Sequence, residues 1–198
     1  MPHMSPSGEL VLASTSRYRR ELLDRLRVPF RMMAAGVNEA PKAGESPRAL
    51  AQRLALAKAT AAAQLAPDAW VIGSDQVATA AERILGKPGT RDACIEQLGF
   101  VSGRTVEFLT ACAVTRQATR ESFQHIDTTR VRFRALKGVE ISRYVDAEQP
   151  FDCAGGFKCE GLGICLFESI ETRDPTALIG LPLIWLAGTL RGCGVAMP

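Results

Sequence analysis

Short apolar runs alternate with amphipathic segments along the first half of the chain. Residues 9–13 and 69–73 are apolar runs of strand length, and residues 30–34 form a weaker one. Apolar residues recur at helical spacing over 18–26, and a longer helix is predicted over 47–65, with a proline in its favoured first position. This alternation of strands and helices predicts an α/β arrangement.

The second half of the chain is dominated by two long β-rich stretches, residues 104–114 and 122–136. Their antiparallel pairing, added to the strands of the first half, predicts an α/β fold with a mixed sheet and flanking helices. The remaining predicted elements are a hairpin over 77–85, a helix from about 90 to 98, a helix over 139–147, a glycine-rich loop over 153–163, a strand over 164–170 and a helix over 183–190.

The length of 198 residues suits one domain or two tightly joined lobes. We expect that domain to span residues 9–198, after a disordered N-terminal tail over residues 1–8. The longest uncharged stretch, 175–190, is interrupted by Pro182 and is too short to cross a membrane. No secretory signal precedes the first strand, so we expect a cytoplasmic protein, and the chain length is compatible with a monomer or a homodimer.

Charge and cysteine content exclude several classes of protein. The formal net charge is only +3, which argues against nucleic-acid binding by bulk electrostatics. Arg130, Arg132 and Arg134 alternate along one strand, and we expect them to form its solvent face. Six cysteines without close pairing predict neither a disulfide framework nor a zinc site, and Cys94 and Cys112 are expected to be buried thiols.

Histidine chemistry is limited by composition. The chain has two histidines, His3 and His125, which excludes a histidine-based metal cage. A Ser-His-Asp triad would have to use His125, since His3 lies in the predicted tail.

The turn between the first strand and the first helix is a candidate anion site. It contains Ser14 and Ser16, and three arginines follow within the first turns of the helix. A helix N-terminus attracts anions through its free N–H groups and its dipole, and guanidinium groups match phosphate oxygens. The alternative is a solvated basic face of the helix.

Carboxylates and lysines elsewhere supply further candidates. Asp75 directly follows the strand at 69–73, and the carboxyl end of a strand is where α/β proteins place ligands. It can hold a divalent cation or accept a proton from water, although an Asp that caps a turn is the common alternative. Glu39, Lys58 and Lys87 are surface residues unless the fold brings them to the serine–arginine turn. No Walker loop occurs, because Gly86-Lys87 is followed by proline.

The loop over 153–163 combines glycines, an aromatic residue and the carboxylate of Glu160, which together can read the edge of a base. With the preceding candidates it predicts a site for a triphosphate and a base with a metal-binding acid.

Several of these motifs, in register, resemble the Maf family of nucleoside triphosphate pyrophosphatases. The resemblance runs from about Glu9 to Gly194. The motifs that carry it are Leu12-Ala-Ser-Thr-Ser-Arg-Tyr-Arg-Arg20, the helix with Lys58, Ile72-Gly-Ser-Asp-Gln76, Gly86-Lys-Pro88, Cys153-Ala-Gly-Gly-Phe-Lys-Cys-Glu-Gly161 and Asp174-Pro-Thr-Ala-Leu-Ile-Gly-Leu-Pro182. Ser-Asp-Gln and Phe-Lys-x-Glu-Gly resemble the branch that acts on 7-methyl-GTP.

The resemblance implies a cytoplasmic enzyme with two lobes around a nucleotide cleft, as in inosine triphosphate pyrophosphatases. The implied reaction hydrolyses the bond between the α- and β-phosphates with a divalent cation, Mg²⁺ or Mn²⁺. Asp75 matches the proton acceptor and Glu39 an acid near the metal. The implied specificity positions are Tyr18, Gln76 and Glu160, and the implied phosphate contacts are Ser14, Arg19, Lys58 and Lys87.

Three residues depart from the family pattern, and two other functions stay open. Arg17 replaces a common proline, Asn38 a frequent aspartate that would add negative charge beside the metal, and Cys159 a common serine. The alternatives are a dTTP- or UTP-type pyrophosphatase of the same family and a nucleotide-binding cell-division regulator with little catalysis. Tyr18 is expected to stack on a base made cationic by N7-methylation, or else to pack on its own helix at Leu22.

Overall fold

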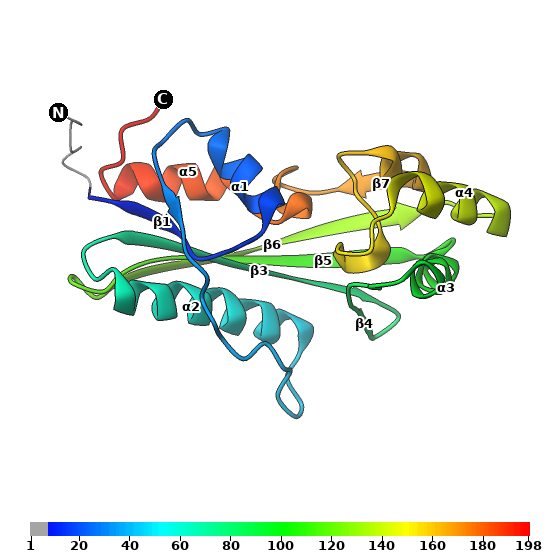
Figure 1. Ribbon diagram of the computed structural model, residues 1–198, viewed down its shortest axis with the longest axis horizontal. Coiled ribbons are helices and arrows are strands. Elements are labelled where there is room, and N and C mark those ends of the chain that lie inside the picture. The colour runs from blue at the N-terminus through cyan, green and yellow to red at the C-terminus, as the bar shows by residue number, and fades with distance from the viewer. Residues whose placement is uncertain (1–7) are drawn as a thin grey trace.

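The computed structural model describes residues 8–198 (Figure 1), so the predicted tail, apart from Gly8, lies outside the described residues. The helices are α1 (Arg17–Asp24), α2 (Pro47–Leu65), α3 (Arg91–Val101), α4 (Gly138–Glu148) and α5 (Leu183–Gly192). The strands are β1 (Leu10–Leu12), β2 (Arg31–Met32), β3 (Trp70–Ala80), β4 (Arg83–Leu85), β5 (Thr105–Arg116), β6 (Glu121–Phe133) and β7 (Phe167–Glu171). Three 3₁₀ turns complete them: η1 (Ala154–Gly156), η2 (Leu162–Leu166) and η3 (Ala177–Ile179).

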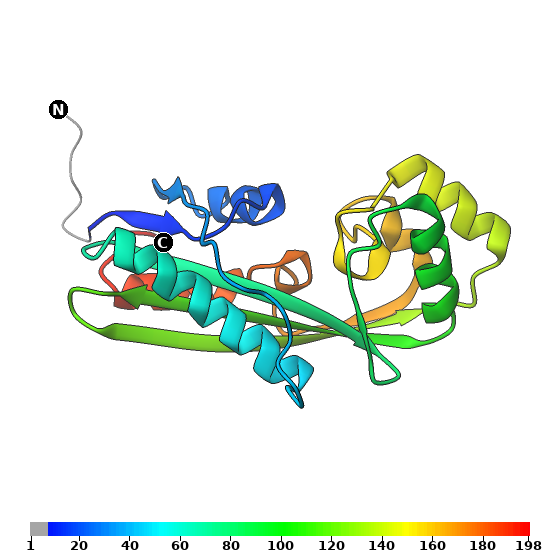
Figure 2. The same cartoon turned by 60° about the horizontal axis from the view of Figure 1, so that its bottom comes forward.

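The strands form one mixed sheet, as the sequence predicts. Among the described residues its order is β2-β1-β3-β5-β6-β7, with β4 paired to β3. β2, β1 and β3 are parallel, whereas β3, β5, β6 and β7 pair antiparallel in that order. The long strands β3, β5 and β6 run along the long axis of the molecule (Figure 2).

Helices gather at the two ends of these long strands and make two lobes (Figures 1 and 2). In the first lobe, α1 and α5 cover one face of the sheet and α2 the other. Their apolar side chains form separate clusters on the two faces of β1, β3 and β5. In the second lobe, α3, α4 and the segment around η1 and η2 enclose a core that includes Phe108, Phe133 and Phe157.

Side chains cap the starts of three helices, and the predicted hairpin is confirmed. The side chains of Ser16, Ser46 and Thr90 cap α1, α2 and α3, each by accepting the N–H of the residue three positions later. The hairpin between β3 and β4 turns through Ala81 and Glu82, both with positive φ.

Two predicted elements are wrong in their bounds. The strand predicted at 69–73 continues as β3 to Ala80, so Asp75 lies within a strand and not at its carboxyl end. The polar run from Ser74 to Gln76 suggested a strand end, but β5 pairs with β3 throughout and neighbouring segments satisfy these polar side chains. The strand predicted at 164–170 begins only at Phe167, because residues 162–166 form η2.

The structure also shows the surroundings of several single residues that the sequence analysis discussed. Cys94 and Cys112 are buried free thiols. Each arginine of the predicted solvent face pairs with a carboxylate: Arg130 with Glu107, Arg132 with Glu168 and Arg134 with Glu140. His125 stacks on Trp185, with 5.2 Å between ring centroids, and is not among the residues that line the cavity described below. No helix in the described part of the chain has the length and apolarity that a membrane crossing requires.

Candidate active site

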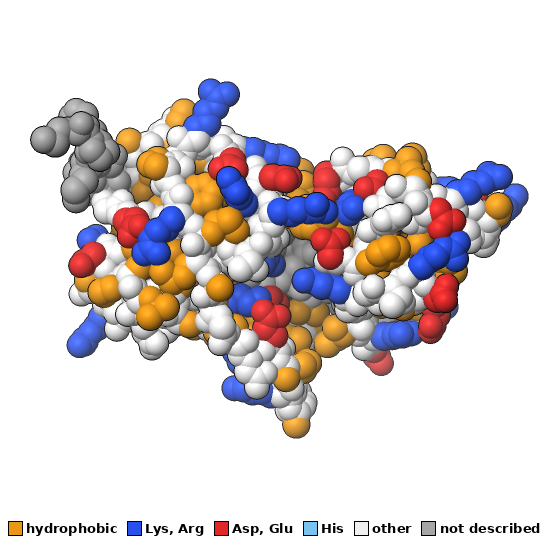
Figure 3. Space-filling model, in the orientation of Figure 1, with side chains coloured by type: hydrophobic (Ala, Val, Ile, Leu, Met, Phe, Trp, Pro, Cys, Tyr) orange, Lys and Arg blue, Asp and Glu red, His pale blue; other side chains and the backbone are white. Residues whose placement is uncertain are grey.

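A cavity of about 880 Å³ lies between the two lobes. Acidic and basic side chains surround this hollow on the face shown in Figure 3. Its lining includes every site residue predicted from the sequence: Ser14, Tyr18, Arg19, Glu39, Lys58, Asp75, Gln76, Lys87 and Glu160. The fold therefore brings together residues that span almost 150 positions of the chain.

The cavity opens on an uncovered stretch of the edge of β3. The parallel strand β1 pairs with β3 only as far as Ile72, and β4 begins to pair at Ala78. Between them, the edge of β3 has no neighbouring strand, so side chains from both faces of the sheet reach the cavity. Asp75 lies on the α2 face and Gln76 on the opposite face, and both line it.

Gly73 allows α2 to pack closely enough to reach this edge. A Cβ at this position would lie 2.2 Å from the carbonyl oxygen of Ala55 and 2.5 Å from the backbone nitrogen of Ala59. Only glycine permits this approach of helix and strand. The approach positions Lys58 of α2 directly against Asp75.

The Lys58 ammonium lies between two carboxylates. Its Nζ is 2.7 Å from Oδ1 of Asp75 and 2.7 Å from Oε1 of Glu39. Lys58 and Asp75 are both 8% exposed. The hydrogen bond from Lys58 lowers the pKa of Glu39 below its ordinary value of 4.5, so Glu39 is ionised at neutral pH. Among the hydrogen bonds of the described residues, none engages Oδ2 of Asp75, which leaves that oxygen for a ligand.

The two carboxylates fit a divalent cation that also binds phosphate. A single ammonium already bridges them, so they lie close enough to share one cation. Among residues 8–198, no group of three or more His, Cys, Asp or Glu residues is placed to hold a metal ion. Mg²⁺ and similar hard cations are bound in this way, by one or two carboxylates completed by phosphate oxygens and water.

Cationic and N–H donors gather at the start of α1. This N-terminus opens beside Ser14, whose Oγ accepts the N–H of Ser16. Arg19 donates from Nε to the carbonyl oxygen of Gly180, which also lies 2.8 Å from Ser74 Oγ. Burial lowers the pKa of Arg19, and Asp75 opposes this shift, so the guanidinium stays charged. With Lys58 and Lys87, this side of the cavity is suited to a polyphosphate.

The side-chain amide of Gln76 has a defined orientation. Its nitrogen lies 2.9 Å from Oγ1 of Thr110 and 3.0 Å from the carbonyl oxygens of Ala177 and Leu178. Two carbonyl acceptors require an N–H₂ group at this position. Oε1 of Gln76 is therefore the end available to a ligand, and it is an acceptor.

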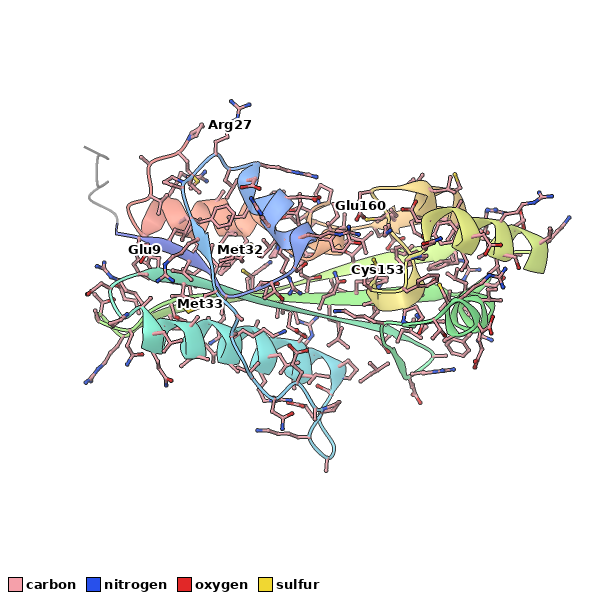
Figure 4. All side chains as sticks on the ribbon, viewed as in Figure 1. Glu9, Arg27, Met32, Met33, Cys153 and Glu160 are labelled. Atoms are coloured by element: carbon pink, nitrogen blue, oxygen red, sulfur yellow. The ribbon has the colours of Figure 1, made fainter. Side chains whose placement is uncertain are left out.

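The opposite side of the cavity is lined by the loop before and after η1. Figure 4 shows Cys153 and Glu160 on the part of the second lobe nearest α1. The hydroxyl of Tyr18 lies 3.4 Å from each carboxylate oxygen of Asp152 and 3.6 Å from Sγ of Cys153. Burial raises the pKa of Tyr18 above its ordinary value, so the phenol stays protonated.

The three departures from the family pattern have distinct surroundings. Cys159 lies with Sγ 3.4 Å from Oε2 of Glu160, so a thiol makes the contact that a serine hydroxyl would offer. Asn38 is exposed and accepts the N–H of Ala40, outside the lining of the cavity. Arg17 lines the cavity beside Tyr18.

Residues that the sequence did not single out also line or build the site. Asp152 faces Tyr18 across the cavity, and Thr110 and Ser74 hold Gln76 and the Gly180 carbonyl in place. Asp152 immediately precedes the predicted glycine-rich loop, which is the only signal in the sequence that pointed toward it.

Comparisons with known proteins match the chain to one family and to several named relatives. Residues 9–193 match the family described as Maf-like protein. A protein of Xanthomonas oryzae pv. oryzae named 7-methyl-GTP pyrophosphatase is 54% identical over 189 residues, which cover 96% of this chain and 98% of the relative. Relatives of the same name from Polaromonas sp. and Alcanivorax borkumensis are 52% and 49% identical, with 96% of this chain covered in each case and 87% and 96% of the relatives.

Proposed function

The chain belongs to the Maf-like protein family, and we propose from this premise that it is a nucleoside triphosphate pyrophosphatase acting on 7-methyl-GTP. The products are the nucleoside monophosphate and pyrophosphate. The observation that carries the proposal is one cavity with cations on one side, base-reading acceptors on the other and the Lys58-bridged carboxylates among them.

Asp75 is the proton acceptor of the proposed reaction. Lys58 holds its Oδ1 by a hydrogen bond, while Oδ2 is available to orient a water molecule and take its proton. That water attacks the α-phosphorus, and the bond to the bridging oxygen of the β-phosphate breaks. Arg19 and Lys87 neutralise the negative charge that develops on the departing pyrophosphate.

Glu39 and Asp75 are the residues that would hold the divalent cation. When bound, Mg²⁺ or Mn²⁺ supplies positive charge that neutralises phosphate oxygens and orients the triphosphate. The ammonium of Lys58 offsets the repulsion between the two carboxylates and lowers the pKa of Glu39.

The base-reading residues favour guanine over a pyrimidine. Oε1 of Gln76 and the carboxylate of Glu160 are both acceptors, and the Watson–Crick edge of guanine carries adjacent N–H donors. Thymine and uracil carry one N–H between two carbonyl oxygens, which two acceptors cannot satisfy equally well. The proposed role of Tyr18 is to stack on the ring of the methylated base.

The state of the cysteines bears on the compartment in which the protein acts. All six cysteines are free thiols, which supports a reducing compartment such as the cytoplasm. A homodimer stays a prediction.

The first test is pyrophosphate release by purified protein with Mg²⁺ or Mn²⁺ across 7-methyl-GTP, GTP, dTTP, UTP and CTP. We expect selective turnover of 7-methyl-GTP. Preference for dTTP or UTP would keep the reaction and contradict the roles of Gln76 and Glu160. Nucleotide binding without turnover would contradict the pyrophosphatase and favour a regulator.

The Asp75→Asn variant tests the proton acceptor within the same assay. The amide keeps an acceptor for Lys58 but cannot take a proton, so we expect kcat to fall by about 10²–10⁴-fold. An unchanged circular dichroism spectrum and melting temperature serve as the folding control. Substantial residual turnover would remove Asp75 from this role.

A further inference from the structure

Arg17, Tyr18 and Asp152 form a group that joins the two lobes at the cavity. The guanidinium carbon of Arg17 lies 4.7 Å from the centroid of the Tyr18 ring. One Arg17 nitrogen donates to the Tyr18 hydroxyl at 2.7 Å and lies 3.9 Å from the carboxylate of Asp152. All three residues line the cavity, so this group belongs to its wall.

The contacts of Arg17 define an environment for a planar cation. A guanidinium is flat and positively charged, and here it has an aromatic face on one side and a carboxylate within ion-pair distance. The base of 7-methyl-GTP is also flat, and methylation at N7 gives it a positive charge that guanine lacks. With N1 protonated, the positive charge and the methyl group distinguish the two bases.

Hydrogen bonds to the Watson–Crick edge do not read this difference. In the proposed binding mode Gln76 and Glu160 face this edge, and its N–H donors are common to GTP and 7-methyl-GTP. A carboxylate beside the aromatic face attracts the methylated ring through its charge, and it gains little from neutral guanine. Asp152 is the carboxylate in contact with Tyr18, at 3.4 Å from the hydroxyl.

We propose that Asp152 is a specificity-determining residue that, with Tyr18, selects the cationic base, and that Arg17 occupies this pair until nucleotide binds. The inference rests on the proposed function, because it names what selects the substrate of the same site. On binding, the methylated base replaces the guanidinium beside Tyr18 and Asp152. The Arg17 side chain, which is 64% exposed, swings toward solvent.

Asp152→Asn tests the charge of this carboxylate without changing its shape. The readout is kcat/KM for 7-methyl-GTP and for GTP, measured at slightly acidic pH, at which the methylated base keeps its N1 proton and its positive charge. We expect kcat/KM for 7-methyl-GTP to fall about tenfold and that for GTP to change less than about twofold. The difference between wild type and variant in the preference for 7-methyl-GTP over GTP should become smaller as salt is added, because Asp152 is 58% exposed and its charge is screened.

Asp24→Asn is the matched control. Asp24 lies on α1 of the first lobe, is 56% exposed and pairs with Arg20 at 3.8 Å, outside the lining of the cavity. The variant changes the net charge equally, so it should leave the ratio of the two kcat/KM values unchanged.

Arg17→Ala tests the second half of the proposal. Removal of the competing cation should lower KM for 7-methyl-GTP, while KM for GTP falls less. An equal change in the constants for both nucleotides, in Asp152→Asn or in Arg17→Ala, would overturn the inference. Arg17, Tyr18 and Asp152 would then serve only to hold the two lobes together.

Failure of the inference is separable from failure of the proposed function. If the wild-type protein releases pyrophosphate from neither nucleotide, the proposed function fails. If it hydrolyses both and Asp152→Asn leaves their ratio unchanged, only the role of Asp152 fails. Calorimetry of 7-methyl-GMP and GMP binding to the wild-type protein and to Asp152→Asn gives a second readout that needs no turnover. We expect the affinity for 7-methyl-GMP relative to that for GMP to fall in the variant.

Discussion

One ammonium group, that of Lys58, pairs with two carboxylates in the cavity. Lys58 contacts Glu39 and Asp75 at 2.7 Å each, and it is largely buried with Asp75. Without Lys58, Glu39 would face the charge of Asp75 with no cation between them, and a like charge nearby raises the pKa of a carboxylate such as Glu39. Lys58 therefore holds the pKa of Glu39 down, in addition to its proposed role in binding phosphate.

Replacement of Lys58 by methionine should raise the pKa of Glu39. In the wild-type protein the lowered pKa means that Glu39 contributes stability above its ordinary value of 4.5, and this contribution is lost as pH falls through the lowered value. In Lys58→Met the pKa moves upward and this contribution disappears. The measurement is an acid titration of the Glu39 carboxyl resonance by NMR.

Lys87→Met provides the comparison for this titration. Lys87 lowers the pKa of Glu39 only through its charge and without a hydrogen bond, so its removal should produce a smaller upward shift. Equal shifts in the two variants would contradict the dominant role of the hydrogen bond from Lys58.

At the scale of elements, the packing of α2 on β3 brings the proposed catalytic groups together. The missing side chain of Gly73 lets the backbone of α2 approach the strand at Ala55 and Ala59. The strand itself is held by β5 along its other edge, which keeps Asp75 in an extended segment with its neighbours Ser74 and Gln76 pointing the opposite way. Small changes in this contact are expected to move Lys58 relative to Asp75.

Gly73→Ala should destabilise the protein and lower its activity. The added methyl group would overlap backbone atoms of α2, so the helix must shift, and overpacking of this kind costs about 1–3 kcal/mol of unfolding free energy. Chemical denaturation measures the stability. The fall in kcat/KM reports how far a displaced Lys58 impairs the reaction.

Gly99→Ala is the matched control for that substitution. Gly99 lies in α3, and nothing lies within 4 Å of a Cβ at this position, so alanine should stabilise the helix by about 0.5–1 kcal/mol. A Gly73→Ala variant as stable and active as wild type would show that the close approach of α2 is not required.

On the scale of the whole molecule, the cavity divides its tasks between lobes. The first lobe supplies Asp75, Lys58 and Arg19, and the loop of the second lobe supplies Glu160 and Asp152. The long strands connect both lobes, so a nucleotide that contacts each of them stabilises the entire fold.

A nucleotide should therefore raise the melting temperature more than pyrophosphate does. All ligands and variants are compared at one fixed concentration, about 100 times the Kd of 7-methyl-GTP for the Asp75→Asn variant, which is expected to be inactive. There 7-methyl-GTP contributes about 2.7 kcal/mol, or roughly 5–10 °C for a chain of this size. Adding Glu160→Gln should reduce this shift and leave that of pyrophosphate unchanged, since pyrophosphate has no base to reach the loop. Equal reduction for both ligands would contradict the division between lobes.

Much of the fold and of the site could be predicted from the sequence, because its signals are local. Apolar periodicity predicts the helices and most strands, and Ser16, Ser46 and Thr90 are recognisable caps because capping needs only three neighbouring positions. Motifs in register identify nine of the residues that line the cavity, since each motif is a short run of residues with its own chemistry.

Tertiary structure alone decided how these residues act on one another. Whether β3 continues past Gly73 depends on pairing with β5, more than 30 residues away, and this pairing overrides the local polarity of Ser74 and Asp75. Arg17 and Asp152 are 135 positions apart, and nothing in their local sequence predicts that they meet. Chemical identity is a property of each residue and can be read along the chain, whereas distance and the sharing of a charge arise only when remote segments pack together.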